Sequence, residues 1–330
     1  MENNRFIVVL GNGNDWCETS LIDFNKIPQS KVVNTKFPCS TTRLVNKMLS
    51  IHFSERLNRK CYLPFQKIWF HKFVKHIHEN RNDEIIIVIY DRNKLANNIP
   101  FLKYLRKYYN NCKLVYVFTN IVKISGATNN NFVNKLNMYY DVVYAFDPSD
   151  APKYNFHYHP LLYSKVADEK PVKEKKQVFY VGKAKDRYQM LVNVYERLEK
   201  LNVHKNFYIF GVEDDKQVYN DKIKYNNYIP YSECIKNIKE SNCLLDIIQG
   251  ESEGFTIKVC EAVMYDKLLI TTNTKVVDAP FYNPDYILVI RDENDITKEF
   301  FDNKKVAYSK EGKEVFSVET FVKHIYKDLF

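Results

Sequence analysis

Glycine is scarce in this chain, with eight glycines among 330 residues. Because glycine reaches backbone conformations that other residues avoid, each one is expected to mark a turn that needs it. Long apolar runs are also missing, and no stretch approaches the ~20 apolar residues that a membrane-spanning helix requires. The amino terminus has a short apolar run without a basic start, which argues against a signal peptide. These absences favour a chain that folds in water.

Close cysteine pairs are missing too. The seven cysteines are spread along the chain, and none has CxxC spacing. Disulfide frameworks and zinc sites both need tighter patterns. His157 and His159 lie close together, but no cysteine, histidine or carboxylate pattern surrounds them. We expect reduced thiols, no metal site and a cytoplasmic protein.

Several catalytic signatures are absent. There is no G-x-S-x-G, H-E-x-x-H or Walker motif, and no D-x-D follows a predicted strand. The loop GNGNDW at residues 11–16 has Trp16 where a dinucleotide fingerprint needs its third glycine. Asp15 could act as a base in this loop, although a turn-shaping role beside Asn12 and Asn14 is the favoured alternative.

Positive charge is concentrated in the first half. Residues 1–150 hold 21 Lys and Arg against 12 Asp and Glu, whereas residues 151–330 hold 28 of each. Cations stand beside aromatics at residues 67–75 and 101–109, where the alternative is helix faces whose aromatics pack inward. The excess favours an anionic partner, namely a membrane surface or a phosphorylated acceptor. A nucleic acid is disfavoured because no nucleic-acid-binding motif is present.

Apolar strands alternate with helical segments along the chain. Such strands, apolar on both faces, are typical of parallel sheets covered by helices. Four prolines and a charged run interrupt the alternation between residues 147 and 176. In the first half we expect strands at residues 5–10, 84–90, 113–118 and 141–146. In the second half we expect strands at residues 177–181, 206–210, 243–249, 267–273 and 286–290.

This pattern predicts an α/β fold of two Rossmann-like domains, with ligands at the carboxyl ends of the strands. The first domain covers residues 1–155 and the second residues 156–315. Residues 316–330 form an amphipathic helix with Phe321, Ile325 and Leu329 on one side, and this helix is expected to pack back on the first domain.

A phosphate-binding turn is predicted in QGESEGFTIKVCEA at residues 249–262. Gly250 and Gly254 loosen the turn after a strand, and a helix begins near Thr256. Exposed amides at a helix start favour phosphate oxygens. Glu253 and Glu261 flank that start, and carboxylates accept hydrogen bonds from sugar hydroxyls. The alternative is a surface helix with ordinary glutamates.

A cation cluster is predicted in YVGKAKDR at residues 180–187. Gly182 turns the chain after a strand, and Lys183, Lys185 and Arg187 follow within six residues. Lysine and arginine both suit a diphosphate. The alternative is a solvated helix start with Asp186 as its cap.

Several ordered segments of the second half together resemble the donor domain of GT-B glycosyltransferases, above all the bacterial enzymes of capsule, exopolysaccharide and lipopolysaccharide assembly. The resemblance covers residues 177–290. The segments that carry it are YVGKAKDR at 180–187, FYIFGV at 207–212, NNYIPYSECIKNIKESNCLLDI at 226–247, EGFTIKVCEA at 253–262 and KLLITTN at 267–273. The first half matches by architecture alone, which implies two domains whose sheets face a cleft.

The resemblance implies a role for each matching residue. Glu253 corresponds to the glutamate that contacts the transferred sugar, and Glu261 to the one that holds the ribose. Lys183 or Lys185 with Arg187 corresponds to the basic pair on the diphosphate. Further donor-side positions are Gly182, Gly254, Phe255, Thr256 and Ile257. Gly211, Ile229 and Pro230 follow strand-like segments and could wall a nucleobase pocket, and the alternative is a turn that leads into a capped helix. On the acceptor side the candidates are Gly11, Asn12, Gly13 and Asn120.

The implied activity is metal-independent transfer, with retention, from a nucleotide-diphospho-sugar to a polysaccharide or lipid-linked acceptor in bacterial surface polysaccharide synthesis. Protein cations and helix-start amides would stabilise the departing diphosphate. The protein would work in the cytoplasm or at the inner face of the plasma membrane. The alternative is a non-catalytic GT-B-like partner in a polysaccharide-synthesis complex.

Overall fold

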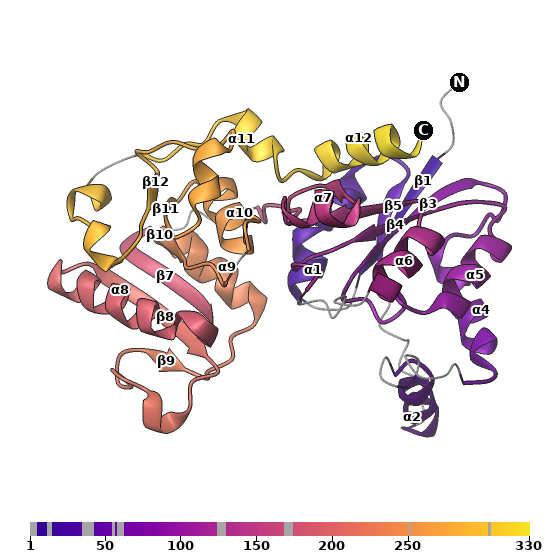
Figure 1. The fold of residues 1–330 in the computed structure, drawn as a ribbon, viewed down its shortest axis with the longest axis horizontal. Coiled ribbons are helices and arrows are strands. Elements are labelled where there is room, and N and C mark those ends of the chain that lie inside the picture. The colour runs from indigo at the N-terminus through magenta and orange to yellow at the C-terminus, as the bar shows by residue number, and fades with distance from the viewer. Residues whose placement is uncertain are drawn as a thin grey trace. The chain divides into compact units, whose positions relative to one another are not determined.

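The chain divides into two units that each hold a parallel sheet. The computed structural model describes residues 5–11, 15–34, 43–54, 57, 63–123, 130–167, 174–250, 252–302 and 305–330. One unit is Met1–His159 with Val318–Phe330, and the other is Pro160–Ser317. Within the described residues each unit has a six-stranded sheet flanked by helices (Figure 1). The predicted fold class, α/β with two Rossmann-like parts, is confirmed.

The first sheet has the strand order β2-β1-β3-β4-β5-β6, and every pairing in it is parallel. Ile85 to Ile89 of β3 are fully buried, because helices cover both faces of this central strand. The strands are β1 (Arg5–Gly11), β2 (Ser30–Asn34), β3 (Glu84–Tyr90), β4 (Asn111–Val117), β5 (Val142–Ala145) and β6 (His157–Tyr158).

Helices α4, α5 and α6 follow one another along one face of this sheet (Figure 1). Phe70 of α4 and Phe101 and Tyr109 around α5 are fully buried in the same core. Phe70, Phe101 and Tyr109 of the two basic segments therefore pack inward. The helices of this unit are α1 (Asp15–Ser20), α2 (Arg43–His52), α4 (Gln66–Ile77), α5 (Ile99–Tyr108), α6 (Asn130–Tyr139), α7 (Asp150–Tyr154) and α12 (Val318–Leu329).

The carboxyl-terminal helix α12 packs on the first unit. The ring of Phe321 lies 5.0 Å from that of Tyr144 in β5. The Tyr144 hydroxyl donates a hydrogen bond of 2.6 Å to Asp328. The expected domain boundary follows residue 155, and the division in the structure lies after His159, with α12 in the first unit.

The second sheet has the strand order β12-β11-β10-β7-β8-β9, again parallel throughout. Helix α8 covers one face, and α9 and α10 cover the other. Its strands are β7 (Lys175–Lys183), β8 (His204–Phe210), β9 (Lys224–Tyr225), β10 (Ser241–Asp246), β11 (Leu268–Thr271) and β12 (Ile287–Val289). Its helices are α8 (Tyr188–Lys200), α9 (Tyr231–Glu240), α10 (Ile257–Met264) and α11 (Lys310–Glu314).

Each sheet has one switch point, where successive connections of the chain run to opposite sides of a strand. A ligand site is expected at that point. In the second sheet the chain leaves β7 toward β8 on one side and returns to β10 on the other. Ligands of open α/β sheets bind outside the carboxyl ends of the strands at such a switch point. The segments after β7 and β10 are therefore the first place to look for a site in the second unit.

Candidate functional site

The start of α10 is fixed to the end of β10 by a buried carboxylate. Thr256 caps the helix, since its side chain accepts a hydrogen bond of 3.2 Å from the Lys258 amide. Its hydroxyl donates to Asp246 Oδ1 at 2.7 Å, and Thr271 of β11 donates to Asp246 Oδ2 at 2.9 Å. Asp246 is 1% exposed. Three neighbouring elements thus hold the positive end of α10 at the carboxyl edge of the sheet.

The glycine turn before α10 lies against the loop after β7. Gly250 has φ +52°, and a Cβ there would lie 3.9 Å from Asp186 Oδ2. The Lys185 ammonium donates a hydrogen bond to the side-chain oxygen of Gln249. Farther along, Asn273 donates from Nδ2 to the carbonyl of Gly254 at 3.2 Å. The predicted turn and the predicted cation loop therefore meet at one edge of the sheet.

Arg187 is held at this edge by backbone carbonyls. Its Nε donates to the Lys183 carbonyl at 3.1 Å, and another of its nitrogens donates to the Ile247 carbonyl. Gly182 lies within β7 and not in a turn after it, and a Cβ there would lie 2.8 Å from the Tyr180 hydroxyl and 3.5 Å from an Arg187 nitrogen, so a larger residue would displace these side chains. The Tyr180 hydroxyl is buried beside the Arg187 guanidinium.

Lys258 is a cation of this site that the sequence pattern does not single out. Its ammonium lies 5.4 Å from the centre of the Tyr180 ring. No acidic side chain in the described ranges comes within 4.0 Å of it as an ion-pair partner. Burial lowers the pKa of Lys258, and the positive charge of Arg187 acts in the same direction, against the carboxylates of Glu261 and Asp246. Two cations are thus gathered near a helix start, where the carboxylates of Glu261 and Asp246 offset part of their charge and an anionic ligand would offset more.

The other predicted cations differ from Arg187. Lys185 is engaged by Gln249, as described above, whereas the Lys183 side chain is exposed at the end of β7. Lys183 and Lys185 therefore lie at the predicted edge but outside the buried part of the site.

Glu261 lies on the inner side of α10 and is 3% exposed. The Tyr231 hydroxyl donates to its Oε1 at 2.9 Å and lies 3.0 Å from the Tyr163 hydroxyl. Burial raises the pKa of Glu261 to about 7, although the nearby Lys258 charge and the Tyr231 hydrogen bond act to lower it. The hydrogen bond between Glu261 and Tyr231 could not be predicted from the sequence interval between Glu253 and Glu261.

Glu253 has a different environment. Its carboxylate is 40% exposed and lies 3.4 Å from the Lys275 ammonium. The two glutamates of the predicted pair therefore differ in burial, and Glu253 is the one open to a solvent-borne ligand.

The remaining donor-side candidates lie around α9 and α10. Gly211 directly follows β8 and has φ +75°. Its amide donates a hydrogen bond of 2.8 Å to Asn226 Oδ1. Pro230 is exposed at the cap position of α9, next to the half-buried Ile229. The ring of Phe255 is half-buried and packs 5.1 Å from that of Phe281. Ile257 begins α10 and is half-buried.

On the acceptor side, polar side chains gather after β1, β3 and β4. Asn93 donates from Nδ2 to the Gly11 carbonyl at 2.9 Å. The Asn120 amide oxygen, oriented toward Arg92, accepts from its guanidinium at 2.7 and 3.2 Å. Asn12 and Gly13 lie outside the described residues. Asp15 begins α1, and its side chain is also outside them.

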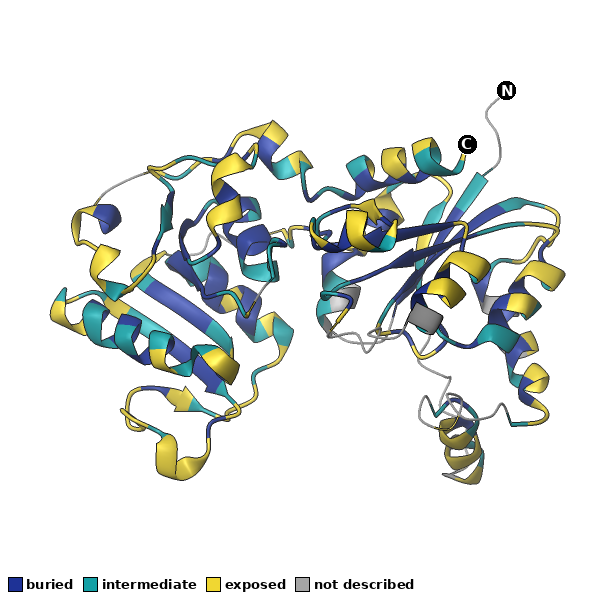
Figure 2. Ribbon diagram, viewed as in Figure 1, coloured by how far each residue is buried: buried dark blue, intermediate teal, exposed yellow. Residues whose placement is uncertain are grey.

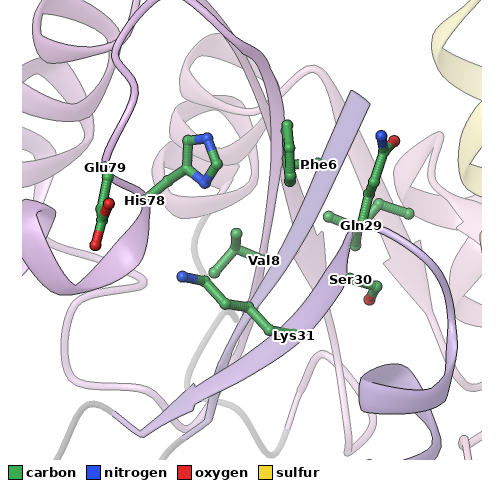
Figure 3. A pocket seen from close by; sticks show the side chains of 8 residues that line it. Phe6, Val8, Gln29, Ser30, Lys31, His78 and Glu79 are labelled. Carbon is green, nitrogen blue, oxygen red and sulfur yellow. The ribbon is translucent and has the colours of Figure 1, made fainter. Parts of the chain in front are cut away.

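A cavity of about 340 Å³ opens at the opposite ends of β1 and β2 (Figure 3). Phe6, Lys31 and His78 line it, and none of the predicted site residues does. His78 is held there by Asp83 at 2.6 Å and by the Phe6 ring at 4.3 Å. Because the cavity lies at the amino ends of the strands, we do not assign the predicted ligand to it.

Two further findings bear on ligands and membranes. In the described part of the chain, no three His, Cys, Asp or Glu side chains come together as metal ligands. No helix in that part is both long enough and apolar enough to cross a membrane.

Comparison with known proteins gives structural likenesses only. No protein-family model and no curated protein sequence matches the chain. The crystal structure of TarM aligns with a TM-score of 0.48 at 14% identity, over 79% of this chain and 57% of TarM, so this chain spans less than two thirds of that one. The glycotransferase of kitacinnamycin aligns with a TM-score of 0.48 at 10% identity, over 100% of both chains. A chain of the Glycosylation Associate Protein (Gap123) complex from Streptococcus agalactiae aligns with a TM-score of 0.45 at 9% identity, over 81% of this chain and 57% of that one.

Proposed function

We propose that this protein transfers a sugar from a nucleotide-diphospho-sugar to a glycan or lipid-linked acceptor. The observation that carries the proposal is the meeting of Arg187, Lys258 and the capped start of α10 at the switch point of the second sheet. Such a convergence of cations and helix-start amides suits a diphosphate. The sequence resemblance to GT-B donor domains independently selects the same segments.

Arg187 and Lys258 are the two side chains we assign to the diphosphate. When the bond at the anomeric carbon breaks, negative charge grows on the departing diphosphate, and preorganised cations stabilise that charge. Arg187 is already fixed by two carbonyls, so little reorganisation is needed when the ligand binds. Exposed Lys183 adds positive charge at the same edge. We therefore propose that transfer needs no metal ion.

For the sugar and the ribose we keep the roles that the resemblance implies. Glu253 is solvent-accessible beside Lys275 and is assigned to the transferred sugar, with retention of its configuration. Glu261 is assigned to the ribose, a role that requires Tyr231 to release its carboxylate. Gly211, Ile229 and Pro230 are assigned to the nucleobase side.

The acceptor is assigned to the first unit. Gly11 and Asn120 stand at the carboxyl ends of its strands, where acceptor hydroxyls would meet the Arg92 and Asn93 side chains. The family resemblance suggests bacterial surface polysaccharide as the product and the cytoplasmic side of the membrane as the place of reaction.

Turnover of a panel of UDP- and GDP-sugars tests this proposal. Purified protein is expected to hydrolyse or transfer at least one of them, and EDTA is expected to leave the rate unchanged. Glu253→Gln should lower turnover more than nucleotide affinity, because its partner is the sugar. A rate lost on chelation and restored by Mn²⁺ would refute the metal-free mechanism.

One observation favours the second candidate function, that of a non-catalytic partner in a polysaccharide-synthesis complex. The Glu261 carboxylate is buried and already accepts a hydrogen bond from Tyr231, so it could hold a ribose only after Tyr231 moves, whereas a structural role needs no such change. A partner protein would bind no sugar nucleotide and turn none over. The panel therefore separates the two candidates.

A further inference from the structure

Helix α2 has one wide apolar face, and only part of that face meets the core. Val45 and Leu49 face the core of the first unit, where Leu49 is 5% exposed. Leu44, Met48 and Ile51 lie along the adjoining edge of this face and are 69%, 44% and 42% exposed. Much of this helix is yellow in Figure 2, the colour of exposed residues. The apolar face of an amphipathic helix is normally covered along its whole width, either by protein or by lipid.

The exposed side of α2 continues onto the start of α4. Phe65 and Ile68 are 74% and 59% exposed. The two helices are joined at this point, because Gln66 donates to the His52 carbonyl at 2.9 Å and Trp69 donates to the His52 ring at 2.8 Å. We refer to Leu44, Met48, Ile51, Phe65 and Ile68 as the α2–α4 surface.

The same stretch of chain carries most of the protein's charge excess. Residues 43–78 contain eight lysines and arginines but a single acidic residue, Glu55, which leaves +7 of the net +9. Lys47 and Lys67 are exposed beside the apolar side chains of α2 and α4. An apolar surface set in a cationic stretch matches the acyl chains and the anionic headgroups of a lipid layer.

We propose that the α2–α4 surface docks this protein on an anionic lipid membrane. Two copies of the surface would repel each other through their like charge, which disfavours self-association. A nucleic acid would meet the cations but leave Leu44, Met48 and Ile51 against water. The surface is separate from residues 101–109, whose apolar side chains are largely buried.

Vesicle co-sedimentation tests the proposal. The wild-type protein is expected to sediment with vesicles of phosphatidylcholine containing one third phosphatidylglycerol, and to stay in solution with phosphatidylcholine alone. Binding should fade as salt screens the charges. Met48→Ser/Ile51→Ser should lower partitioning about tenfold or more, and Lys47→Glu/Lys67→Glu should do the same.

Met138→Ser is the matched control, because Met138 is 71% exposed on α6 of the same unit, away from this surface. Its partitioning should equal that of the wild type. Circular dichroism should show unchanged folding in all variants, since every substituted side chain is exposed.

Three outcomes would overturn the proposal. They are no binding of the wild type to anionic vesicles, equal binding by Met48→Ser/Ile51→Ser, and self-association that this double substitution abolishes. None of these measurements involves sugar transfer, so their failure would leave the proposed activity untouched.

Discussion

Glu261 is the residue in which burial and charge oppose each other most clearly. It is 3% exposed, and Tyr231 is its one hydrogen-bond donor among the contacts described above. Burial penalises the ionised form, which raises the pKa of Glu261 from its ordinary value of 4.5 to about 7. Its protonation therefore changes near neutral pH, whichever role it has.

The raised pKa of Glu261 predicts a pH-dependent stability. Between about pH 4.5 and 7 Glu261 is protonated in the folded state but ionised in the unfolded state. Protonation of Glu261 therefore stabilises the folded state at low pH, and this stabilisation is lost as pH rises through 7. Glu261→Gln should remove that loss. In urea titrations, the free energy of unfolding of the variant should rise relative to that of the wild type between pH 5 and pH 8, by up to about 3 kcal/mol.

The matched control for this experiment is Glu311→Gln, since Glu311 is exposed in α11. Its stability should follow the wild type at every pH. A constant difference between Glu261→Gln and the wild type across this range would contradict the raised pKa.

At the scale of elements, the start of α10 links stability to ligand binding. Thr256 joins the helix cap to buried Asp246, so its hydroxyl serves two partners. Capping residues stabilise helices by about 1 kcal/mol, and loss of the hydroxyl would also leave Asp246 with one fewer donor. The same amides form the proposed phosphate site.

Thr256→Ala is therefore expected to lower the free energy of unfolding by about 1–2 kcal/mol and also to weaken UDP binding. Thr256→Ser should retain both properties. Ser309→Ala is the matched control, because Ser309 caps α11 through the Gly312 amide in the same unit, away from the site. It should lose stability but keep the affinity for UDP, and an equal loss of affinity in both variants would count against a site at α10.

The strands buried on both faces could be predicted from the sequence, because a parallel strand reads as one continuous apolar run. The predicted residues 84–90 coincide with β3. The short edge strands β2, β6 and β9 have no such run, and β6 lies in the proline-containing interruption at residues 147–176. Their place in the sheet depends on partners distant in the chain.

The candidate site could be predicted in part. Glycines and cations after strands indicate the turn and the loop, since these signals are local. The approach of Lys258 to Tyr180, and the burial of Glu261 under Tyr231, depend on how α9 and α10 pack on the sheet. Helical spacing alone does not say which of several polar side chains faces a ligand.

For the whole molecule, charge and chemistry belong to different units. The second unit holds the proposed diphosphate site, and residues 151–330 have equal numbers of acidic and basic residues. The first unit carries the charge excess and the α2–α4 surface. This separation fits a protein in which one unit binds a small anionic donor and the other meets a large acceptor or surface.

Calorimetric titration of UDP and GDP tests the central claim most directly, namely that Arg187 and Lys258 hold a nucleoside diphosphate at the switch point of the second sheet. The wild type should bind at least one of the two. Arg187→Gln and Lys258→Gln should each weaken binding about tenfold or more, because a hydrogen bond to a charged group contributes about 1.5–3 kcal/mol. Lys236→Gln, at an exposed lysine of α9, should bind as the wild type does. No binding by the wild type, or equal affinity in the Arg187 and Lys258 variants, would contradict the account.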